Sequence, residues 1–264
     1  MDLASFSLEP ELLAFRKLLL ITNELRERCP WDREQTIESI RHLTIEEVHE
    51  LSSAILSGDT EEIKKELGDL IMHVVFYSRI ASEMQKFNIA DVLKGISEKL
   101  IRRHPHVYGK VDADNSEKVK KNWEKIKLSE TNKSVLDGVP LSLPSLIKAF
   151  RIQEKVAGVG FDWTDKKQVL EKVKEEIREI EEILAEAPGN TERLSEEIGD
   201  ALFALVNFSR FSKINPDDAM EKANRKFQKR FIMMEDMIKK EGKDISKLKM
   251  EEWDLLWEEV KKEC

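Results

Sequence analysis

Glu46-Glu47-Val48-His49-Glu50, followed by Glu66-Leu67-Gly68-Asp69, is the stretch of sequence that decides the fold. The same arrangement returns as Glu175-Glu176-Ile177-Arg178-Glu179 and Glu197-Ile198-Gly199-Asp200. In each block carboxylates recur three residues apart, and on an α-helix that spacing brings side chains onto one face. The repetition in order along the chain predicts one helical module used twice.

Apolar residues recur every three or four positions along most of the chain, which is typical of amphipathic helices. No segment shows the alternation of a β-strand, so the predicted fold class is all-α. The expected helices cover residues 12–25, 45–56, 63–80, 170–184, 194–211 and 219–238. Short breaks at Gly58-Asp59 and Pro188-Gly189-Asn190 predict that the two acidic helices of each half form a helical hairpin.

The two halves share further blocks in the same order. Lys99 to Arg103 matches Lys226 to Arg230, and Trp123 matches Trp257. A segment rich in Ser, Asn, Asp, Gly and Pro separates the halves. We therefore expect an N-terminal helical domain over residues 1–128, a linker over 129–144 and a C-terminal helical domain over 145–264.

Composition narrows the class of protein. The net charge of −8 argues against the backbone of a nucleic acid as the main partner. The longest apolar run, residues 201–206, is too short to span a bilayer, and the N-terminus lacks the blocks of a secretory signal. Two cysteines are too few for a disulfide framework or a thiolate zinc site, so we expect a cytoplasmic protein without a membrane partner.

The acidic clusters have an ordinary interpretation, because in a chain with 52 acidic residues Glu-rich helices are usually solvated faces. Glu66 and Asp69, however, precede a run that is apolar on every side of the helix, as do Glu197 and Asp200. We therefore expect these helices to be buried. Buried carboxylates need a counter-charge or a proton.

Ligands that offer only oxygen favour Mg²⁺, with Mn²⁺ as a possible substitute, and no EF-hand loop is present to favour Ca²⁺. Four carboxylates overcharge one divalent ion. The pattern therefore predicts several metal ions or nearby cations, together with a substrate rich in phosphate. Gly68 and Gly199, between the paired acids, would let a backbone or a ligand approach closely.

With Cys29-Pro30-Trp31-Asp32 and the block from Arg102 to Val107 added, the chain resembles MazG-type nucleoside triphosphate pyrophosphohydrolases over nearly its whole length. The resemblance implies tandem all-α domains whose bundles are completed by dimerisation, and hence a homodimer. It implies Mg²⁺-dependent hydrolysis of nucleoside triphosphates to monophosphate and pyrophosphate. We expect broad tolerance of the base, as in an enzyme that cleans the nucleotide pool.

The resemblance also assigns residues. The implied metal ligands are Glu47, Glu50, Glu66 and Asp69 in the first half, and Glu176, Glu179, Glu197 and Asp200 in the second. Glu175 or Glu176 is the expected base that deprotonates the attacking water. The expected contacts to the nucleotide are Lys172, Arg193, Asn224, Lys226, Lys229, Arg230 and Trp257. Secondary candidates in the first half are Glu46, Lys99, Arg102, Arg103 and Trp123.

Several of these residues keep a second interpretation. Lys226 and Arg230, four apart, can pair with phosphate oxygens or form a solvated basic face. Trp257 can stack on a base or pack in the core. Asn224 can orient a phosphate or a water, or be a surface amide.

The halves differ in positive charge. Lys172 and Arg193 lie one helical turn before Glu176 and Glu197, whereas the matching residues of the first half are Leu43 and Glu62. A tetra-anionic substrate needs cations close by, so we expect the second half to be the principal catalytic site. The first half would bind metal weakly, act on another nucleotide or serve assembly.

Two other functions stay open on the sequence. One is a related helical pyrophosphatase with a narrow substrate, such as dUTP or phosphoribosyl-ATP. The other is a non-catalytic module that binds a nucleotide or a partner protein. Burial of eight carboxylates argues against a pure scaffold.

Overall fold

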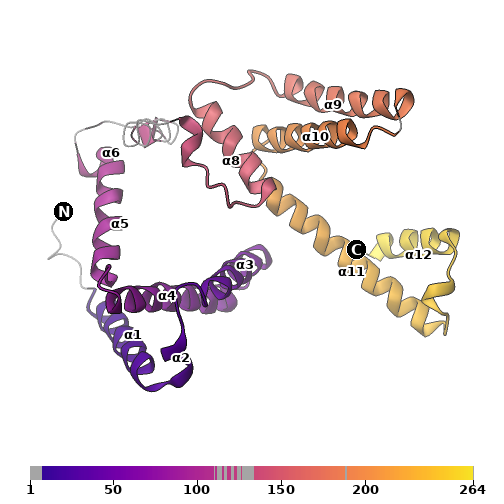
Figure 1. The fold of residues 1–264 in the computed structure, drawn as a ribbon. Coiled ribbons are helices and arrows are strands. Elements are labelled where there is room, and N and C mark those ends of the chain that lie inside the picture. The colour runs from indigo at the N-terminus through magenta and orange to yellow at the C-terminus, as the bar shows by residue number, and fades with distance from the viewer. Residues whose placement is uncertain are drawn as a thin grey trace. The chain divides into compact units, whose positions relative to one another are not determined.

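The computed structural model describes residues 8–109, 134–187 and 189–263, together with residues 111, 115, 118, 119, 122, 123 and 126. These residues form helices and turns without a β-strand, which confirms the predicted all-α fold (Figure 1). The chain divides into two compact units, Met1–Lys127 and Leu128–Cys264. Among the helices described, none combines the length and apolar character that crossing a membrane requires.

The helices agree with the predicted ranges. Those of the first unit are α1 (Glu9–Arg28), α2 (Pro30–Glu34), α3 (Arg41–Ser57), α4 (Thr60–Glu83), α5 (Ile89–Arg103) and α6 (Pro105–Tyr108). Those of the second unit are η2 (Val135–Gly138), α8 (Ser145–Gly158), α9 (Lys166–Glu186), α10 (Thr191–Phe211), α11 (Pro216–Lys240), η3 (Ile245–Lys247) and α12 (Met250–Glu263).

Each unit contains the predicted hairpin of acidic helices, α3 with α4 and α9 with α10 (Figure 1). Gly58 ends α3 with φ of 73°, a left-handed conformation that glycine adopts without steric cost. Asp59 then accepts hydrogen bonds from the backbone N–H groups of Glu61 and Glu62 and starts α4. In the second unit Asn190 caps α10 in the same way through the N–H of Arg193.

The core of the first unit lies between the start of α3 and the C-terminal part of α4, where Ile40, Phe76 and Ile80 are buried together. Thr44 and Tyr77 join the two helices through a hydrogen bond of 2.7 Å between their hydroxyl groups. This packing holds the acidic faces of α3 and α4 opposite each other.

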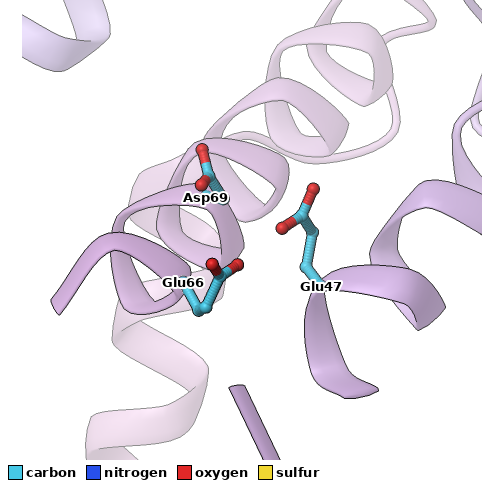
Figure 2. Close-up of side chains that lie close together, drawn as sticks. All are labelled: Glu47, Glu66 and Asp69. Carbon is cyan, nitrogen blue, oxygen red and sulfur yellow. The ribbon is translucent and has the colours of Figure 1, made fainter. Parts of the chain in front are cut away.

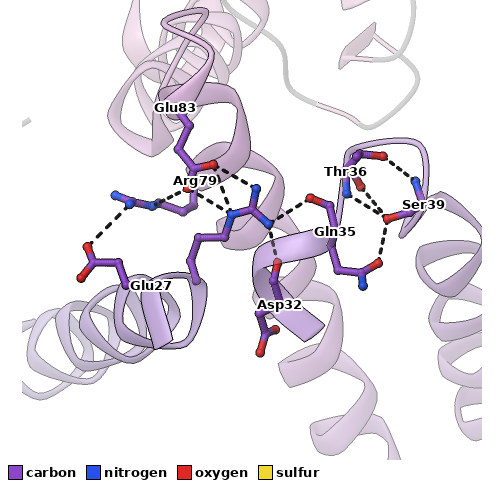
Figure 3. Close-up of polar contacts among 8 residues, drawn as sticks. Glu27, Asp32, Gln35, Thr36, Ser39, Arg79 and Glu83 are labelled. Atoms are coloured by element: carbon purple, nitrogen blue, oxygen red, sulfur yellow. Dashed lines mark hydrogen bonds and ion pairs between the residues drawn. The ribbon is translucent and has the colours of Figure 1, made fainter. Parts of the chain in front are cut away.

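Arg26 on α1 ties α2 and its C-cap residue Gln35 to α4. Figure 3 labels the partners of Arg26, which are Asp32, Gln35 and Glu83. The Arg26 guanidinium donates to the Glu83 carboxylate at 3.0 Å and to the backbone oxygens of Asp32 and Gln35, the latter at 2.9 Å. The Arg26 side chain is only 10% exposed, so these contacts replace most of its hydration. Arg79, on the same helix as Glu83, forms an ion pair with it, with 3.3 Å between Arg79 Nε and Glu83 Oε1.

The prediction of helices buried on every side is wrong for the described chain. On α4, Val75 and Phe76 are buried, but Ile71 and Val74 are exposed. On α10, Ala201 and Val206 are buried, and the exposed apolar residues are Leu202, Phe203 and Leu205. The reason is that the described helices of each unit leave one side of its hairpin uncovered.

The apolar stripe of α3 shows the same effect. Ile45, Val48 and Ile55 are exposed, whereas the face that turns toward α4 carries Glu47 and the buried Ala54. No other backbone of the described chain approaches Gly68 or Gly199 closely, because outside their own helix no described atom lies within 4 Å of the position that a Cβ would take. Close approach of a ligand there stays a prediction.

The predicted linker is described only in part. Residues 129–133 lie outside the described residues, and residues 134–144 include η2, which packs on α8. Lys155 of α8 donates to the backbone oxygen of Val135 at 3.2 Å. The exact domain boundaries at 128 and 145 stay a prediction.

Candidate active site

Three carboxylates converge between α3 and α4. Glu47 of α3 faces Glu66 and Asp69 of α4 across the hairpin (Figure 2). One oxygen of each residue lies within 4.8 Å of the others. Glu66 is 2% exposed, and Glu47 and Asp69 are half-buried. This group is called the first cluster below.

The matching residues of the second unit converge in the same way. Glu176 of α9 lies close to Glu197 and Asp200 of α10, again with one oxygen of each within 4.8 Å of the others. Glu176 is 4% exposed, Glu197 is half-buried and Asp200 is exposed. This group is called the second cluster. The repeated sequence therefore forms a repeated constellation.

Glu50 and Glu179 stand beside these groups of three. Glu50 is exposed and lines a polar pocket of about 350 Å³ together with Ser53, Ser57 and Glu66. The negative charge of Glu66 raises the pKa of Glu50. A hydrogen bond with Glu179 raises the pKa of Glu197, so Glu179 contacts the second cluster.

The electrostatics of the first cluster favour shared protons or a bound cation. Burial and a hydrogen bond with Glu66 raise the pKa of Glu47. Burial also disfavours the charged form of Glu66, but the hydrogen bond from Lys65 and that from Glu47 outweigh it and lower its pKa. Between these two acids, a proton therefore binds more favourably to Glu47 than to Glu66.

The donor set fits a hard divalent cation. Glu66 Oε2 is buried and has no hydrogen-bond partner among the described residues. A buried oxygen without a partner is costly, and a metal ion would satisfy it together with the oxygens of Glu47 and Asp69. Oxygen-only sets of this kind suit Mg²⁺ or Mn²⁺.

Lysines supply positive charge at both clusters. Lys172 Nζ lies 2.7 Å from Glu175 Oε1 and 2.6 Å from Glu176 Oε1, and these contacts raise the pKa of Lys172. In the first unit Lys65 Nζ lies 3.2 Å from Glu66 Oε1. Its hydrogen bonds to Glu66 and Glu62 raise the pKa of Lys65 to about 12.

Lys65 is a residue that sequence reasoning missed. Adjacent residues on a helix do not normally face each other, so its position next to Glu66 gave no signal. The contact of Lys65 with Glu66 places positive charge at the first cluster. The two halves therefore differ less in positive charge than Lys172 and Arg193, compared with Leu43 and Glu62, indicate in the sequence. Each cluster has one lysine in direct contact with its most buried carboxylate.

The predicted basic and aromatic contacts to the nucleotide gather on a different pair of helices. The Arg230 guanidinium of α11 lies 5.6 Å from the centre of the Trp257 ring of α12, and Phe227 packs on the same ring at 5.4 Å. In the first half Arg103 lies 5.5 Å from the Trp123 ring, so the repeat keeps this pairing.

No contact that the structure describes joins these pairs to the carboxylate clusters. Figure 1 shows α12 alongside the C-terminal half of α11, which extends away from the α9–α10 hairpin. Among the residues predicted to contact the nucleotide, Lys172 is the one with a described contact to a cluster residue, Glu176. The other predicted residues that are exposed are Glu46, Lys99, Arg102, Glu175, Arg193, Asn224, Lys226 and Lys229. Asn224 hydrogen-bonds Glu221 within α11.

Comparison with known proteins places both clusters in one family. A model of the MazG nucleotide pyrophosphohydrolase domain matches residues 35–108 and 164–231, and each match contains one cluster. The nucleoside triphosphate pyrophosphohydrolase of Escherichia coli is 41% identical over 254 residues, which cover 94% of this chain and 97% of that protein.

Two further relatives are similar in extent. The nucleoside triphosphate pyrophosphohydrolase/pyrophosphatase MazG of Thermotoga maritima is 43% identical over 94% of this chain and 96% of its own length. The Bacillus subtilis protein YabN is 44% identical over 95% of this chain and 52% of its own length. The chain therefore belongs to the MazG family and carries two MazG domains in tandem.

Proposed function

We propose that this protein hydrolyses nucleoside triphosphates to nucleoside monophosphate and pyrophosphate with the help of Mg²⁺. The observation that carries the proposal is the convergence of three carboxylates from a helical hairpin, twice in one chain. The relatives from Escherichia coli and Thermotoga maritima are named for pyrophosphohydrolase activity, and they match along almost their whole length.

In the second unit Glu176, Glu197 and Asp200 would hold the cation, with Glu179 beside them. When bound, a divalent ion supplies positive charge that offsets the charge of the triphosphate oxygens. Glu175 is exposed on the same helix and can accept the proton of the attacking water. The water oxygen forms the new bond to phosphorus as pyrophosphate leaves with the electrons of the broken bond.

Under this proposal Lys172 forms ion pairs with different groups before and after the substrate binds. Without substrate its ammonium group pairs with Glu175 and Glu176. With substrate and a cation bound, Glu176 would pair with the cation, and Lys172 would be free to pair with a phosphate oxygen. Lys172 thus neutralises first the site and then the leaving group.

We also propose a homodimer. Its support is the uncovered apolar face of each acidic hairpin, which includes Ile45, Val48 and Ile71 in the first unit and Leu202 and Leu205 in the second. A second copy that covers these faces would exclude water from the clusters. In that assembly α11 and α12 of one copy would bring Lys226, Arg230 and Trp257 to the cluster of the other. We expect the protein in a reducing cytoplasm.

Product analysis tests this function. The purified chain is incubated with Mg²⁺ and each common nucleoside triphosphate, and the products are separated. We expect monophosphate and pyrophosphate in equal amounts from several bases, and loss of turnover when a chelator removes Mg²⁺. Formation of diphosphate and free phosphate would refute the proposed reaction, and turnover of a single base would refute broad tolerance.

A further inference from the structure

His73 is a buried polar side chain of α4 to which the proposed function gives no role. The residue is 5% exposed, and its Nδ1 atom is buried and has no hydrogen-bond partner among the described residues. Glu66 Oε2 has the same properties, and a buried polar atom without a partner costs free energy that a ligand can recover. Burial lowers the pKa of His73, and the charge of Asp69 offsets only part of this shift. Near neutral pH the imidazole is therefore uncharged and keeps a nitrogen lone pair.

His73 lies on the same face of α4 as the carboxylates of the first cluster. It follows Asp69 by four residues, which is about one helical turn. This face turns toward α3, where Glu47 meets Asp69. One turn beyond His73, the Tyr77 hydroxyl lies 2.7 Å from the Thr44 hydroxyl of α3, and the rings of His73 and Tyr77 pack edge to face. The imidazole therefore lies between α3 and α4, in the layer next to the three carboxylates.

The second unit has an alanine in place of this histidine. The repeat aligns Asp69 with Asp200, so Ala204 takes the position of His73. Ala204 is buried, and its methyl group offers no donor atom to a ligand. The two clusters therefore match in their carboxylates and in their lysines, but a nitrogen donor stands next to the first cluster only at this position of the repeat.

The spaces beside the two clusters also differ. The polar pocket of about 350 Å³ beside the first cluster has no aromatic residue among those that line it, and its acidic lining residues are Glu50, Asp59, Glu62 and Glu66. A lining of this charge attracts cations. Next to the second cluster, a cavity of about 530 Å³ lies between α8, the turn after α8 and α10, with mainly apolar walls that include Phe161, Trp163, Phe203 and the side chain of Lys172. The surroundings of the first cluster therefore suit a metal ion better than an organic molecule.

We propose that the first cluster is a site for a first-row transition metal ion, such as Fe²⁺ or Co²⁺, held by its three carboxylates and by an imidazole nitrogen of His73. Oxygen ligands alone suit Mg²⁺, whereas imidazole nitrogen favours these transition metals. In the structure the close ligand atoms are those of the carboxylates, so the imidazole reaches the ion by a rotation of its side chain. The second cluster, with Ala204 in place of His73, keeps its preference for Mg²⁺. The two units therefore hold different metals.

Pulsed electron paramagnetic resonance of bound Mn²⁺ tests the nitrogen ligand directly. The reference variant is the full chain, without a tag, that carries Glu176→Gln and Glu179→Gln, so that the ion binds at the first cluster. We expect modulation from an imidazole nitrogen in the reference variant and its loss when His73→Gln is added. His49→Gln is the matched control, because His49 is an exposed histidine two residues after Glu47, and it should leave the signal unchanged.

Metal selectivity gives a second readout. Co²⁺ and Mg²⁺ are titrated by calorimetry into the reference variant with and without His73→Gln. Glutamine offers an oxygen in place of the nitrogen. We therefore expect the ratio of Co²⁺ affinity to Mg²⁺ affinity to fall roughly 10- to 100-fold, as is common when a residue that supports a metal site is replaced. An unchanged ratio overturns the proposal.

A further variant keeps the test decisive if His73→Gln does not fold. It retains His73 in the reference variant and replaces the other four histidines, His42, His49, His104 and His106, with glutamine. Circular dichroism checks the fold of each protein. A nitrogen signal in this folded variant supports His73 as the ligand. Loss of the signal there, absence of a signal in the reference variant, or a signal that survives His73→Gln overturns the proposal.

These measurements are independent of the proposed hydrolysis, since none of them requires turnover. A chain that releases pyrophosphate with Mg²⁺ but shows no nitrogen signal overturns this inference and leaves the proposed function standing. A nitrogen signal from a chain that releases no pyrophosphate supports this inference and refutes the proposed function.

Discussion

Glu66 and Glu176 are carboxylates that lie almost wholly out of contact with water and next to other carboxylates. Such groups are stable only with a shared proton, a salt bridge or a metal ion. The structure shows a salt bridge at each cluster, from Lys65 to Glu66 and from Lys172 to Glu176, and the raised pKa of Glu47 favours a proton beside Glu66. We infer that a divalent ion, when bound, would take the place of these partners at the carboxylates.

Lys172→Met provides a test at the residue level. The substitution keeps most of the length of the side chain and removes the charge that competes for Glu176. We expect Mg²⁺ to bind the nucleotide-free variant more tightly than the parent, while KM for nucleoside triphosphate rises. Calorimetric titration of Mg²⁺ and steady-state kinetics measure the two effects.

Lys174→Met is the matched control, because Lys174 pairs with Glu171 on the exposed side of the same helix. It should change neither quantity. Weaker Mg²⁺ binding by Lys172→Met would show that the lysine supports the metal ion instead of competing with it.

Metal binding should depend on pH in a direction that the carboxylates determine. A hydrogen bond with Glu179 raises the pKa of Glu197, and burial raises that of Glu47, in both cases above the ordinary 4.5. Protons therefore compete with Mg²⁺, whose affinity should rise as pH increases from about 4.5 and level off above the raised values. Titration at several pH values in buffers of different ionisation enthalpy would detect the released protons.

The same shifts have a consequence for the metal-free chain. In the window above 4.5 the folded state holds protons at Glu47 and Glu197 that the unfolded state has already lost. These groups therefore make the metal-free fold less stable as pH rises through that window. Mg²⁺ should restore the melting temperature there, and an equal effect of Mg²⁺ at all pH values would contradict the shared protons.

At the level of helices, the hairpins depend on contacts that hold their ends. Arg26 joins α1, the turn after it and α4 through Glu83 and two backbone oxygens. Asp59 and Asn190 fix the starts of α4 and α10. These contacts set the position of each acidic face, so losing them would displace the carboxylates of the clusters.

Arg26→Ala should lower the free energy of unfolding of the first unit by about 2 kcal/mol, because hydrogen bonds to a charged group are lost and backbone oxygens lose a donor. Denaturant unfolding followed by circular dichroism measures the change. Arg28→Ala is the control, since Arg28 is 77% exposed and pairs only with Glu24 in the described contacts. Its effect should stay within about 0.5 kcal/mol, and equal effects of both variants would contradict the role of Arg26.

The helices and the hairpins were predictable because local signals determine them. The apolar period marks α3, α4, α9 and α10, and Gly58 marks the turn. The spacing of Glu66 and Asp69 also placed both acids on one face, where Glu47 meets them. The face of α3 that packs was not predictable, since Ile45 and Val48 form a good apolar stripe and still lie exposed.

Other features depend on side-chain conformations or on contacts between residues far apart in the sequence, and they left no local signal. The contact between Lys65 and Glu66 depends on side-chain conformations that spacing does not reveal. The packing of Arg230 on Trp257 depends on how α12 folds back on α11. The cavity beside Lys172 needs three separate segments, so its lining could not be read from the repeat alone.

At the scale of the molecule, the duplication raises the question of which unit performs the chemistry. Both clusters have the same carboxylates and a lysine. Each cluster also adjoins a described pocket: Lys65 lines the polar pocket of the first unit, and Lys172 lines a mainly apolar cavity with aromatic walls in the second. Position next to an aromatic cavity, more than charge alone, favours the second unit as the principal catalytic site.

Paired variants separate the two units. Glu176→Gln with Glu179→Gln should lower pyrophosphate release roughly 100-fold, as expected for loss of metal ligands. The matched pair Glu47→Gln with Glu50→Gln should leave most of the activity. A larger loss from the first-unit pair, measured with both proteins fully folded by circular dichroism, would reverse the assignment of the units.

The most direct test of the central claim is a crystal structure with Mn²⁺ and a non-hydrolysable nucleoside triphosphate, with anomalous scattering used to locate the metal. We predict an anomalous peak among Glu176, Glu197 and Asp200, bridged to the phosphates of the nucleotide. A nucleotide bound in the crystal with no metal peak at either carboxylate cluster would contradict the account.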